Sequence, residues 1–165
     1  MAFLNSLSQI RAVEWSRNYL WDIRFDDKDL AGTFKDWFPA TTLEEQAVSI
    51  QSHILQIGML EFKVPYEKKV DTIKLTFIDD AAQTLYSFFK KWMEVTIAHN
   101  GNYIATLSEA VKTLQIAKLK PDKTPITNLT RTLYVFPDGS LTFNGTANES
   151  KPNSYSITFV VAGKK

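Results

Sequence analysis

The sequence predicts an α+β fold that is mainly β: a small β-barrel or packed antiparallel sheets with one flanking α-helix. Three observations support this fold class. Several segments alternate apolar and polar residues, which is the pattern of a strand with one buried face. The segment at about 80–94 instead spaces its apolar residues by three and four, as in an amphipathic helix. Aromatic residues make up 13% of the 165 residues, and aromatic side chains favour sheets.

Strands are predicted wherever this alternation is sustained. The first, at 18–25, places three aromatic residues and an isoleucine at every second position. The segment at 71–78 has the cleanest alternation of the whole chain. Further strands are predicted at 47–57, 59–64, 111–119, 128–136, 141–143 and 155–161.

Glycine and proline mark the predicted turns between these strands. Gly58 ends the strand that begins at residue 47, and Pro65 ends the next one, because proline donates no ladder hydrogen bond. Residues 137–139 (Pro-Asp-Gly) predict another turn. The segment 34–42 is aromatic without a clear period, so a loop is expected there.

The predicted helix at 80–94 has a wide apolar stripe on one face. Asp79 and Asp80 are expected to cap its first turn, and Gln83 stands three residues after Asp80, as in a capping box. Two lysines, at 90 and 91, lie near the other end, where the helix dipole favours positive charge. One helix cannot bury such a stripe by itself, so a sheet is expected to cover it. The stripe consists of Ala81, Leu85, Phe88, Phe89 and Trp92.

The bulk composition predicts one domain spanning 1–165, in which 1–17 form an N-terminal arm or short helix. The net charge is +1, from 19 basic and 18 acidic residues, so the chain lacks the basic surface that nucleic-acid binding normally needs. The same balance lets copies of the chain approach without strong repulsion. The absence of cysteine excludes disulfides and thiolate metal sites. Residues 1–8 do not resemble a secretory signal, and no apolar run is long enough to span a membrane.

The sequence offers little from which to build a catalytic or metal site. His53 falls in a predicted strand and His99 precedes a turn, so each is expected to be a packing or surface residue. Residues 26–29 (Asp-Asp-Lys-Asp) lack the glycine and the bidentate glutamate of a calcium loop, and a solvated turn is predicted there. Metal-binding and phosphate-binding motifs do not occur. We therefore expect a protein that is not an enzyme and that carries no metal or cofactor.

A loosely basic stretch surrounds two of the predicted strands. It consists of Lys63, Lys68, Lys69 and Lys74. Contact with a nucleic acid or an acidic partner is one interpretation, and a solvated strand face is the other. The spacing of these lysines within strands favours the solvated face.

Two parts of the chain show a distinctive order of elements. Residues 70–80 (Val-Asp-Thr-Ile-Lys-Leu-Thr-Phe-Ile-Asp-Asp) run from an alternating strand into an acidic turn, and the helix that follows ends near Trp92. The second part begins with an aromatic-proline turn and ends with an alternating strand. Its segments are 134–137 (Tyr-Val-Phe-Pro), 141–143 (Leu-Thr-Phe) and 154–159 (Ser-Tyr-Ser-Ile-Thr-Phe).

From about Asn18 to Val161, this order resembles the tail-tube proteins of contractile bacteriophages. The chain departs from that family in its Pro-Asp-Gly turn, where Pro-Thr is more usual, and in its Ala-Gly-Lys-Lys end, where an aromatic acidic tail is usual. The resemblance implies a tail-tube-like fold, which the needle protein of type VI secretion shares in general form. It also implies that six copies join into a ring and that the rings stack into a hollow tube.

The same resemblance implies the partners and the location of the protein. Besides other copies of itself, these partners are the tail sheath, tape measure and baseplate hub proteins. The resemblance further implies that DNA passes through the lumen without sequence-specific binding. The protein is expected in the virion tail, after synthesis in the cytoplasm of a host bacterium, with no membrane span.

Three alternatives remain open at this point. The chain is either a tube subunit or the baseplate tube-initiator of the same fold. A monomeric β-barrel that binds a ligand through the Trp37-Phe38 loop is an alternative of another class, and an enzyme with a scattered site ranks last. By fold analogy, 26–42 and 58–69 are the predicted contact loops, and the strands within 47–64 are predicted to supply a protruding hairpin for the next ring.

Overall fold

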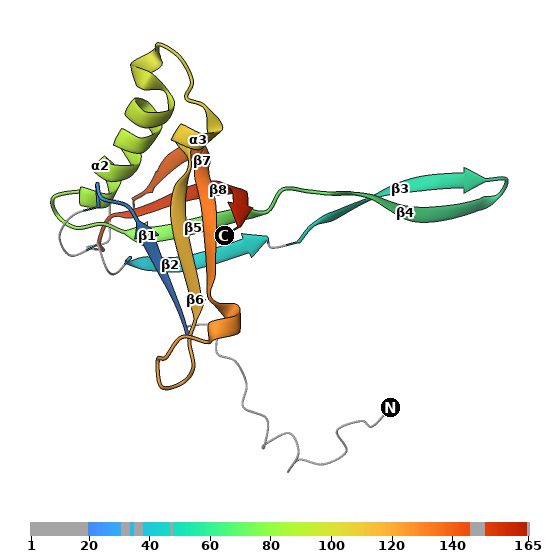
Figure 1. Cartoon of the computed structure of the whole chain (residues 1–165), viewed down its shortest axis with the longest axis horizontal. Coiled ribbons are helices and arrows are strands. Elements are labelled where there is room, and N and C mark those ends of the chain that lie inside the picture. The colour runs from blue at the N-terminus through green and yellow to red at the C-terminus, as the bar shows by residue number, and fades with distance from the viewer. Residues whose placement is uncertain (1–19, 31–33, 35–37, 47, 146–150, 165) are drawn as a thin grey trace.

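A six-stranded antiparallel sheet is the centre of the computed structural model, which describes residues 20–30, 34, 38–46, 48–145 and 151–164 (Figure 1). Its strand order is β1-β6-β7-β8-β5-β2, and every neighbouring pair is antiparallel. The sheet curls into a half-barrel, which confirms the predicted mainly β fold. The strands span Trp21–Asp26 (β1), Ala40–Gln46 (β2), Thr72–Ile78 (β5), Lys112–Lys118 (β6), Arg131–Asn144 (β7) and Ser154–Lys164 (β8).

A two-stranded ribbon projects far beyond this sheet (Figure 1). Its strands, β3 (Ile50–Ile57) and β4 (Leu60–Lys68), pair antiparallel around a turn at Gly58. Because β3 follows β2 and β4 precedes β5, the ribbon continues the β2–β5 ladder. The Lys69 amide donates a hydrogen bond to the Ser49 carbonyl at 2.8 Å where the two ladders meet. The structure therefore contains the protruding hairpin that the sequence predicts.

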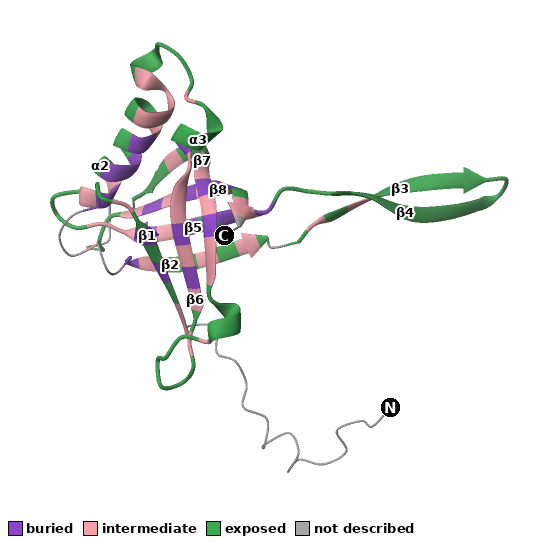
Figure 2. Ribbon diagram, in the orientation of Figure 1, coloured by how far each residue is buried: buried purple, intermediate pink, exposed green. Residues whose placement is uncertain are grey.

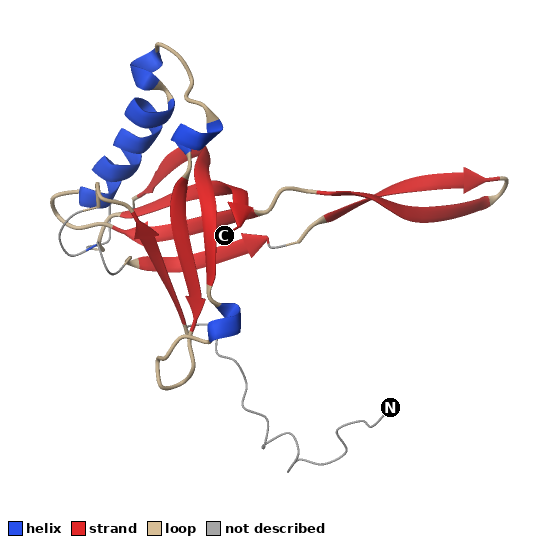
Figure 3. Cartoon of the chain, in the orientation of Figure 1, coloured by secondary structure: helices blue, strands red, loops and turns tan. Residues whose placement is uncertain are grey.

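The main helical segment follows β5 and lies on one side of the sheet (Figure 3). α2 (Thr84–Lys91) is α-helical and continues directly into the π-helical segment η2 (Trp92–Ile97). The helix predicted at 80–94 is thus present, but it begins and ends later than expected and changes helix type. The shorter helices are η3 (His99–Gly101), α3 (Leu107–Ala110) and η4 (Thr127–Leu129).

The core lies between α2 and the inner face of the curled sheet (Figure 2). Alternate residues of β5 are completely buried, so the strand turns one whole face toward the helix. Phe89 of α2 is also fully buried. Six aromatic rings lie with centroids 5.1–6.3 Å from its ring: Phe25, Phe38, Phe77, Phe88, Trp92 and Phe159.

Pro65 does not end a strand, contrary to the prediction. β4 continues beyond it, and the register shifts at this point: Ser52 faces Pro65, whereas Gln51 faces Glu67. Tyr66 is therefore an extra residue on β4, and the ladder contains a bulge. Each strand of a two-stranded ribbon has an unpaired outer side, so the missing proline N–H does not interrupt a central ladder.

The turn predicted at 137–139 is also wrong, because β7 runs unbroken through these residues. Between Asp138 and Thr142, β7 advances by four residues while its partner β8 advances by two. Gly139 lies within this bulge with a φ of 85°, a conformation that glycine adopts without steric cost. The Pro-Asp-Gly sequence therefore marks a bulge and not a turn, because pairing with β8 keeps the strand continuous.

The sequence does not predict β2, which covers the end of the expected loop at 34–42. Its residues, Ala-Thr-Thr-Leu-Glu-Glu-Gln, have no apolar alternation. β2 lies at the edge of the sheet beside β5, and only Ala40 and Leu43 pack against the core. The other predicted strands are confirmed with shifted ends, and the predicted arm at 1–17 lies outside the described residues.

Acidic residues cap α2 as expected, although they do not form the predicted capping box. The carboxylates of Asp79 and Asp80 accept hydrogen bonds from the amides of residues 84–86, at 2.8–3.0 Å. These amides have no partner within the helix, so the two carboxylates satisfy them. Gln83 has a left-handed conformation with a φ of 55° and makes no capping bond through its side chain.

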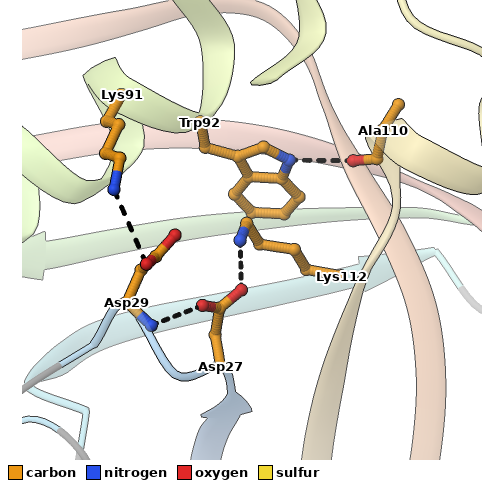
Figure 4. Close-up of polar contacts among 6 residues, drawn as sticks. All are labelled: Asp27, Asp29, Lys91, Trp92, Ala110 and Lys112. Carbon is orange, nitrogen blue, oxygen red and sulfur yellow. Dashed lines mark hydrogen bonds and ion pairs between the residues drawn. The ribbon is translucent and has the colours of Figure 1, made fainter. Parts of the chain in front are cut away.

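Two ion pairs connect the loop after β1 to the helical segment and to β6 (Figure 4). Lys112 pairs with Asp27, and only 14% and 9% of these side chains are exposed. The Lys112 ammonium also lies 5.4 Å and 5.5 Å from the ring centroids of two helix aromatics. Lys91 lies 3.5 Å from Asp29 nearer the surface. The Trp92 indole donates to the carbonyl of residue 110 at 2.8 Å, so polar contacts brace both sides of the segment.

The cap of α2 makes a testable contribution to the pH dependence of stability. The hydrogen bonds from the Thr84 backbone amide and then from its hydroxyl lower the pKa of Asp80 below its ordinary value of 3.8. A carboxyl with a lowered folded-state pKa stabilises the fold above its unfolded pKa, and this contribution disappears as the pH falls through the folded-state pKa. We expect the stability advantage of the wild type over Asp80→Asn to be present at pH 6 and to shrink below about pH 4. Urea unfolding of both proteins between pH 6 and pH 2.5 measures this, and a constant difference contradicts it.

The mostly buried Lys112–Asp27 pair provides a second prediction. Lys112→Met keeps much of the apolar stem but leaves the Asp27 carboxylate without its partner, so we expect a loss of about 3 kcal/mol in the free energy of unfolding. The double variant Lys112→Met/Asp27→Asn removes that unpaired charge and should recover part of the loss. Lys91→Met is the matched control, because its exposed pair contributes at most about 1 kcal/mol. Equal losses at positions 91 and 112 in urea unfolding would contradict the prediction.

Candidate assembly interface

The β3–β4 ribbon has one largely apolar face and one largely polar face. Residues that stand opposite each other in an antiparallel ladder point to the same face, and the faces alternate along each strand. The apolar face consists of the pairs Ile57–Leu60, Leu55–Phe62 and His53–Val64. The other face consists of the pairs Gln56–Glu61, Ile54–Lys63 and Ser52–Pro65.

The apolar face of the ribbon is open to solvent (Figure 2). Every residue of β4 is exposed, and the exposed fractions reach 47% at Phe62 and 68% at Ile57. Met59, in the turn at the tip, is 99% exposed. Soluble monomers rarely expose a continuous apolar surface of this kind, and such surfaces mark sites of association. The ribbon is therefore the candidate assembly surface of the chain.

Side-chain contacts near the base of the ribbon hold its two strands together. The Tyr66 hydroxyl donates a hydrogen bond to Gln51 Oε1 at 2.6 Å. The His53 ring lies edge-on to the Tyr66 ring, with centroids 6.3 Å apart. A segment that is ordered before it binds loses less conformational entropy on docking. The two strands of the ribbon are thus already paired in one register before the ribbon docks.

A second group of exposed apolar residues lies in the segment that follows η2 along the chain, between η3 and the start of α3. Tyr103, Ile104 and Leu107 are 62%, 72% and 58% exposed. The His99 ring stacks on the Tyr103 ring, with centroids 4.1 Å apart. His99 and Asn100 both have positive φ values, of 42° and 55°, so this turn is held in a conformation that non-glycine residues seldom adopt.

The two predicted contact loops have different outcomes. Residues 58–69 are exposed throughout and form the tip and one strand of the ribbon. Within 26–42, by contrast, Leu30 and Phe38 are buried, with 2% and 4% exposed. Phe38 packs in the aromatic core, so the predicted ligand contact through this residue is wrong, and Trp37 lies outside the described residues.

The residues considered for chemistry do not form a reactive site in the described part of the chain. His53 lies on β3, in the ribbon, and His99 lies in the turn after η2. The acidic segment 26–29 is engaged with lysines, as described above. Across the described ranges, no three or more histidine, aspartate or glutamate side chains are grouped to hold a metal ion.

The basic stretch does not form one continuous patch. Lys63 lies on the polar face of the ribbon, and Lys68 lies 3.9 Å from Asp71 at its base. Lys74 faces Glu44 across the β2–β5 ladder. These lysines are close together only in the sequence. In the structure they lie on different surfaces of the ribbon and the sheet.

The sheet itself ends in two outer strands, β1 and β2, which have no strand on their outer side among the described residues. An outer strand presents free backbone N–H and C=O groups along its edge, and these can pair with another chain. The sequence did not reveal this feature, because it depends on the order of strands in the sheet. No helix in the described ranges has the length and apolar character needed to cross a membrane.

Comparison with known proteins gives matches to solved structures, and none by sequence. No protein-family model matches the sequence, and a search of curated proteins finds no match. A chain of an extracellular contractile injection system, the PVC sheath-tube complex in the extended state, is 19% identical with a TM-score of 0.62, over 97% of this chain and 96% of that one. A chain of the PVC sheath/tube terminator is 19% identical with a TM-score of 0.63, over 93% and 98%.

A third structure extends the similarity to another kind of tail. A chain from the tail of an empty GTA particle is 13% identical, with a TM-score of 0.54, over 90% of this chain and 96% of that one. These matches span nearly the whole length of both partners, so the similarity is one of the whole chain and not of a single part. The chain therefore has the fold of the contractile tail-tube family, as its resemblance to that family predicts.

Proposed function

We propose that this protein is a non-enzymatic structural subunit of the tube of a contractile tail or related injection apparatus. The observation that carries the proposal is the formed β3–β4 ribbon, whose apolar face the chain leaves open to solvent. Six copies of one tail-tube-like domain, spanning 1–165, make a ring. Successive rings stack when the ribbon of each copy docks on the next ring.

Burial of the ribbon supplies the free energy for this stacking. Covering a large apolar side chain contributes about 1.5–3 kcal/mol relative to leaving it in water. Ile57, Leu60 and Phe62 alone offer three such side chains per copy. Part of this gain offsets the loss of translational and rotational freedom on association, and a ring repeats the contact with every copy.

The properties of the sheet support lateral association into a ring. The outer strands carry unpaired backbone groups, and closed rotational symmetry pairs every such edge with a neighbour. The net charge of +1 imposes little repulsion between copies. The solved structures with this fold include sheath-tube and baseplate assemblies, which supports a place beside sheath and baseplate proteins. Tape measure and baseplate hub proteins are the further partners that we propose.

In this role the protein belongs to the virion tail and is made in the cytoplasm of a host bacterium. DNA is the proposed cargo, and it passes through the lumen without sequence-specific contacts. The second candidate is a ring at one end of the tube, either the initiator at the baseplate or a terminator. The similarity to the terminator chain favours it, since its TM-score of 0.63 matches the 0.62 of the sheath-tube chain. A tube subunit polymerises by itself, whereas an end subunit stops at single rings.

Substitution on the apolar face of the ribbon tests the proposal. Phe62→Lys places a charge within the proposed contact, so we expect folded protein that no longer stacks into tubes. Phe62 is 47% exposed and lies outside the core, so the free energy of unfolding should change by no more than about 0.5 kcal/mol. Negative-stain electron microscopy of the purified protein scores rings and tubes, and urea unfolding checks the fold.

Gln56→Lys is the matched control, because it adds the same charge to the opposite face of the same ribbon. It should assemble as the wild type does. Failure of the wild type to form rings or tubes at any concentration tested would refute the proposed function. Equal loss of stacking in both variants would refute the role of the apolar face.

A further inference from the structure

We propose that Arg131 and Glu45 are positioning residues, whose ion pair fixes the direction in which the β3–β4 ribbon leaves the sheet. This inference rests on the proposed function and deepens it, because a ribbon held in one direction is aimed at its docking site on the next ring. The two residues lie on strands that are not neighbours, Arg131 at the start of β7 and Glu45 near the end of β2.

The ion pair spans the inner face of the curled sheet. β8 and β5 stand between β7 and β2, so these two strands are three strand spacings apart, or roughly 14 Å along the sheet. Glu45 is opposite Ile73 of β5, and Arg131 is opposite Ile116 of β6. Both isoleucines are buried in the core, and opposite residues share a face, so both charged side chains lie on the core side. The curl of the sheet is what brings them within reach of each other.

The contact between the two side chains is bidentate. Nη1 of Arg131 donates a hydrogen bond to one carboxylate oxygen of Glu45, and Nη2 donates to the other. Such a contact fixes the relative orientation of the two planar groups as well as their separation. Only 31% of the Arg131 side chain and 17% of the Glu45 side chain are exposed, so water and salt screen the pair less than at an open surface. The pair is therefore a directional link between β7 and β2.

This link is attached to the base of the ribbon. Glu45 is the last residue but one of β2, and the chain enters the ribbon soon after Gln46. The Thr72 hydroxyl donates to Gln46 Oε1 at 3.3 Å, which joins β2 to β5, a strand that is already its neighbour. A ladder of two strands still twists and bends out of its own plane. The link to β7 crosses the inner face, outside that plane, so it opposes bending at the base.

Small rotations at the base matter because the ribbon is long. β4 has nine residues, which at about 3.3 Å each give an arm of roughly 30 Å. A rotation of about 10° at the base moves the tip by about 5 Å, which is the distance between neighbouring strands. A ribbon that is free to rotate also loses this freedom when it docks, whereas a ribbon held in one direction does not. The Arg131–Glu45 pair thus favours docking without touching the docking surface.

Pulsed electron paramagnetic resonance measures the direction of the ribbon within one copy. The chain has no cysteine, so Met59→Cys at the tip and Lys118→Cys on β6 place two spin labels at exposed positions. Dilution with unlabelled protein restricts the measurement to distances within single chains. We expect one narrow distance in the otherwise wild-type chain. Arg131→Met removes the link and should widen the distribution by at least about 5 Å.

Three further variants separate a positioning role from a general contribution to stability. Arg131→Lys keeps the charge but not the bidentate contact, so it should widen the distribution while the protein remains folded. The exchange Arg131→Glu/Glu45→Arg restores the pair in reverse and should narrow the distribution again. Lys112→Met is the matched control, because it breaks a largely buried pair between β6 and the loop after β1 and should leave the distance narrow.

The same variants without spin labels test the consequence for assembly. We expect Arg131→Met and Arg131→Lys to form rings as the wild type does, but to need a concentration at least about tenfold higher for tubes. The charge exchange should form tubes at the wild-type concentration. Negative-stain electron microscopy across a concentration series scores rings and tubes, and urea unfolding establishes that each variant is folded. If Arg131→Met does not fold, Arg131→Lys decides the result.

Two results overturn the inference: a distribution as narrow in Arg131→Lys as in the wild type, or an equal widening in Lys112→Met. Tubes that form at the wild-type concentration from a variant with a widened distribution overturn the role of the pair in docking. A narrow wild-type distance in a protein that forms no rings or tubes overturns the proposed function, while the link between Arg131 and the direction of the ribbon is supported.

Discussion

The packing of α2 against the curled sheet is the interaction on which the rest of the structure depends. The ring of Phe89 meets rings from β1, β5 and β8, strands that lie far apart in the chain. A sheet that packs three such strands against one helix on one of its sides is curled, because each strand must turn its buried face toward that helix. The curl then determines where β2 and β5 leave the sheet, and so the position of the ribbon.

The same core explains why no other described part of the chain covers the ribbon. The helix stripe and the inner face of the sheet cover each other, whereas β3 and β4 extend past this layer with no described element against them (Figure 2). A two-stranded ribbon alone in water is only marginally stable. Here the ribbon continues the β2–β5 ladder, so the sheet holds its two strands together at the base. Its apolar face remains exposed and available to another copy.

Assembly and folding therefore use different parts of the chain. The core is aromatic and buried. The Lys112–Asp27 ion pair beside it is mostly buried, and the carboxylates before α2 accept hydrogen bonds from the first amides of the helix. The outward-facing features are an apolar ribbon and the strand edges. Because the exposed apolar residues of the ribbon lie outside the core, effects of their substitution on assembly can be separated from effects on folding.

The sequence by itself determined the elements whose signal is local. Period-two alternation at 71–78 and the stripe of the helix are properties of neighbouring residues, and the hairpin follows from two alternating segments around Gly58. Only the tertiary structure decided which strands are neighbours. Pairing with β5 makes β2 a strand although its residues lack apolar alternation, and pairing with β3 continues β4 past Pro65. The tertiary structure also decided that Phe38 is buried at 4% exposure while Phe62 is 47% exposed, because burial depends on the layer that packs against each residue.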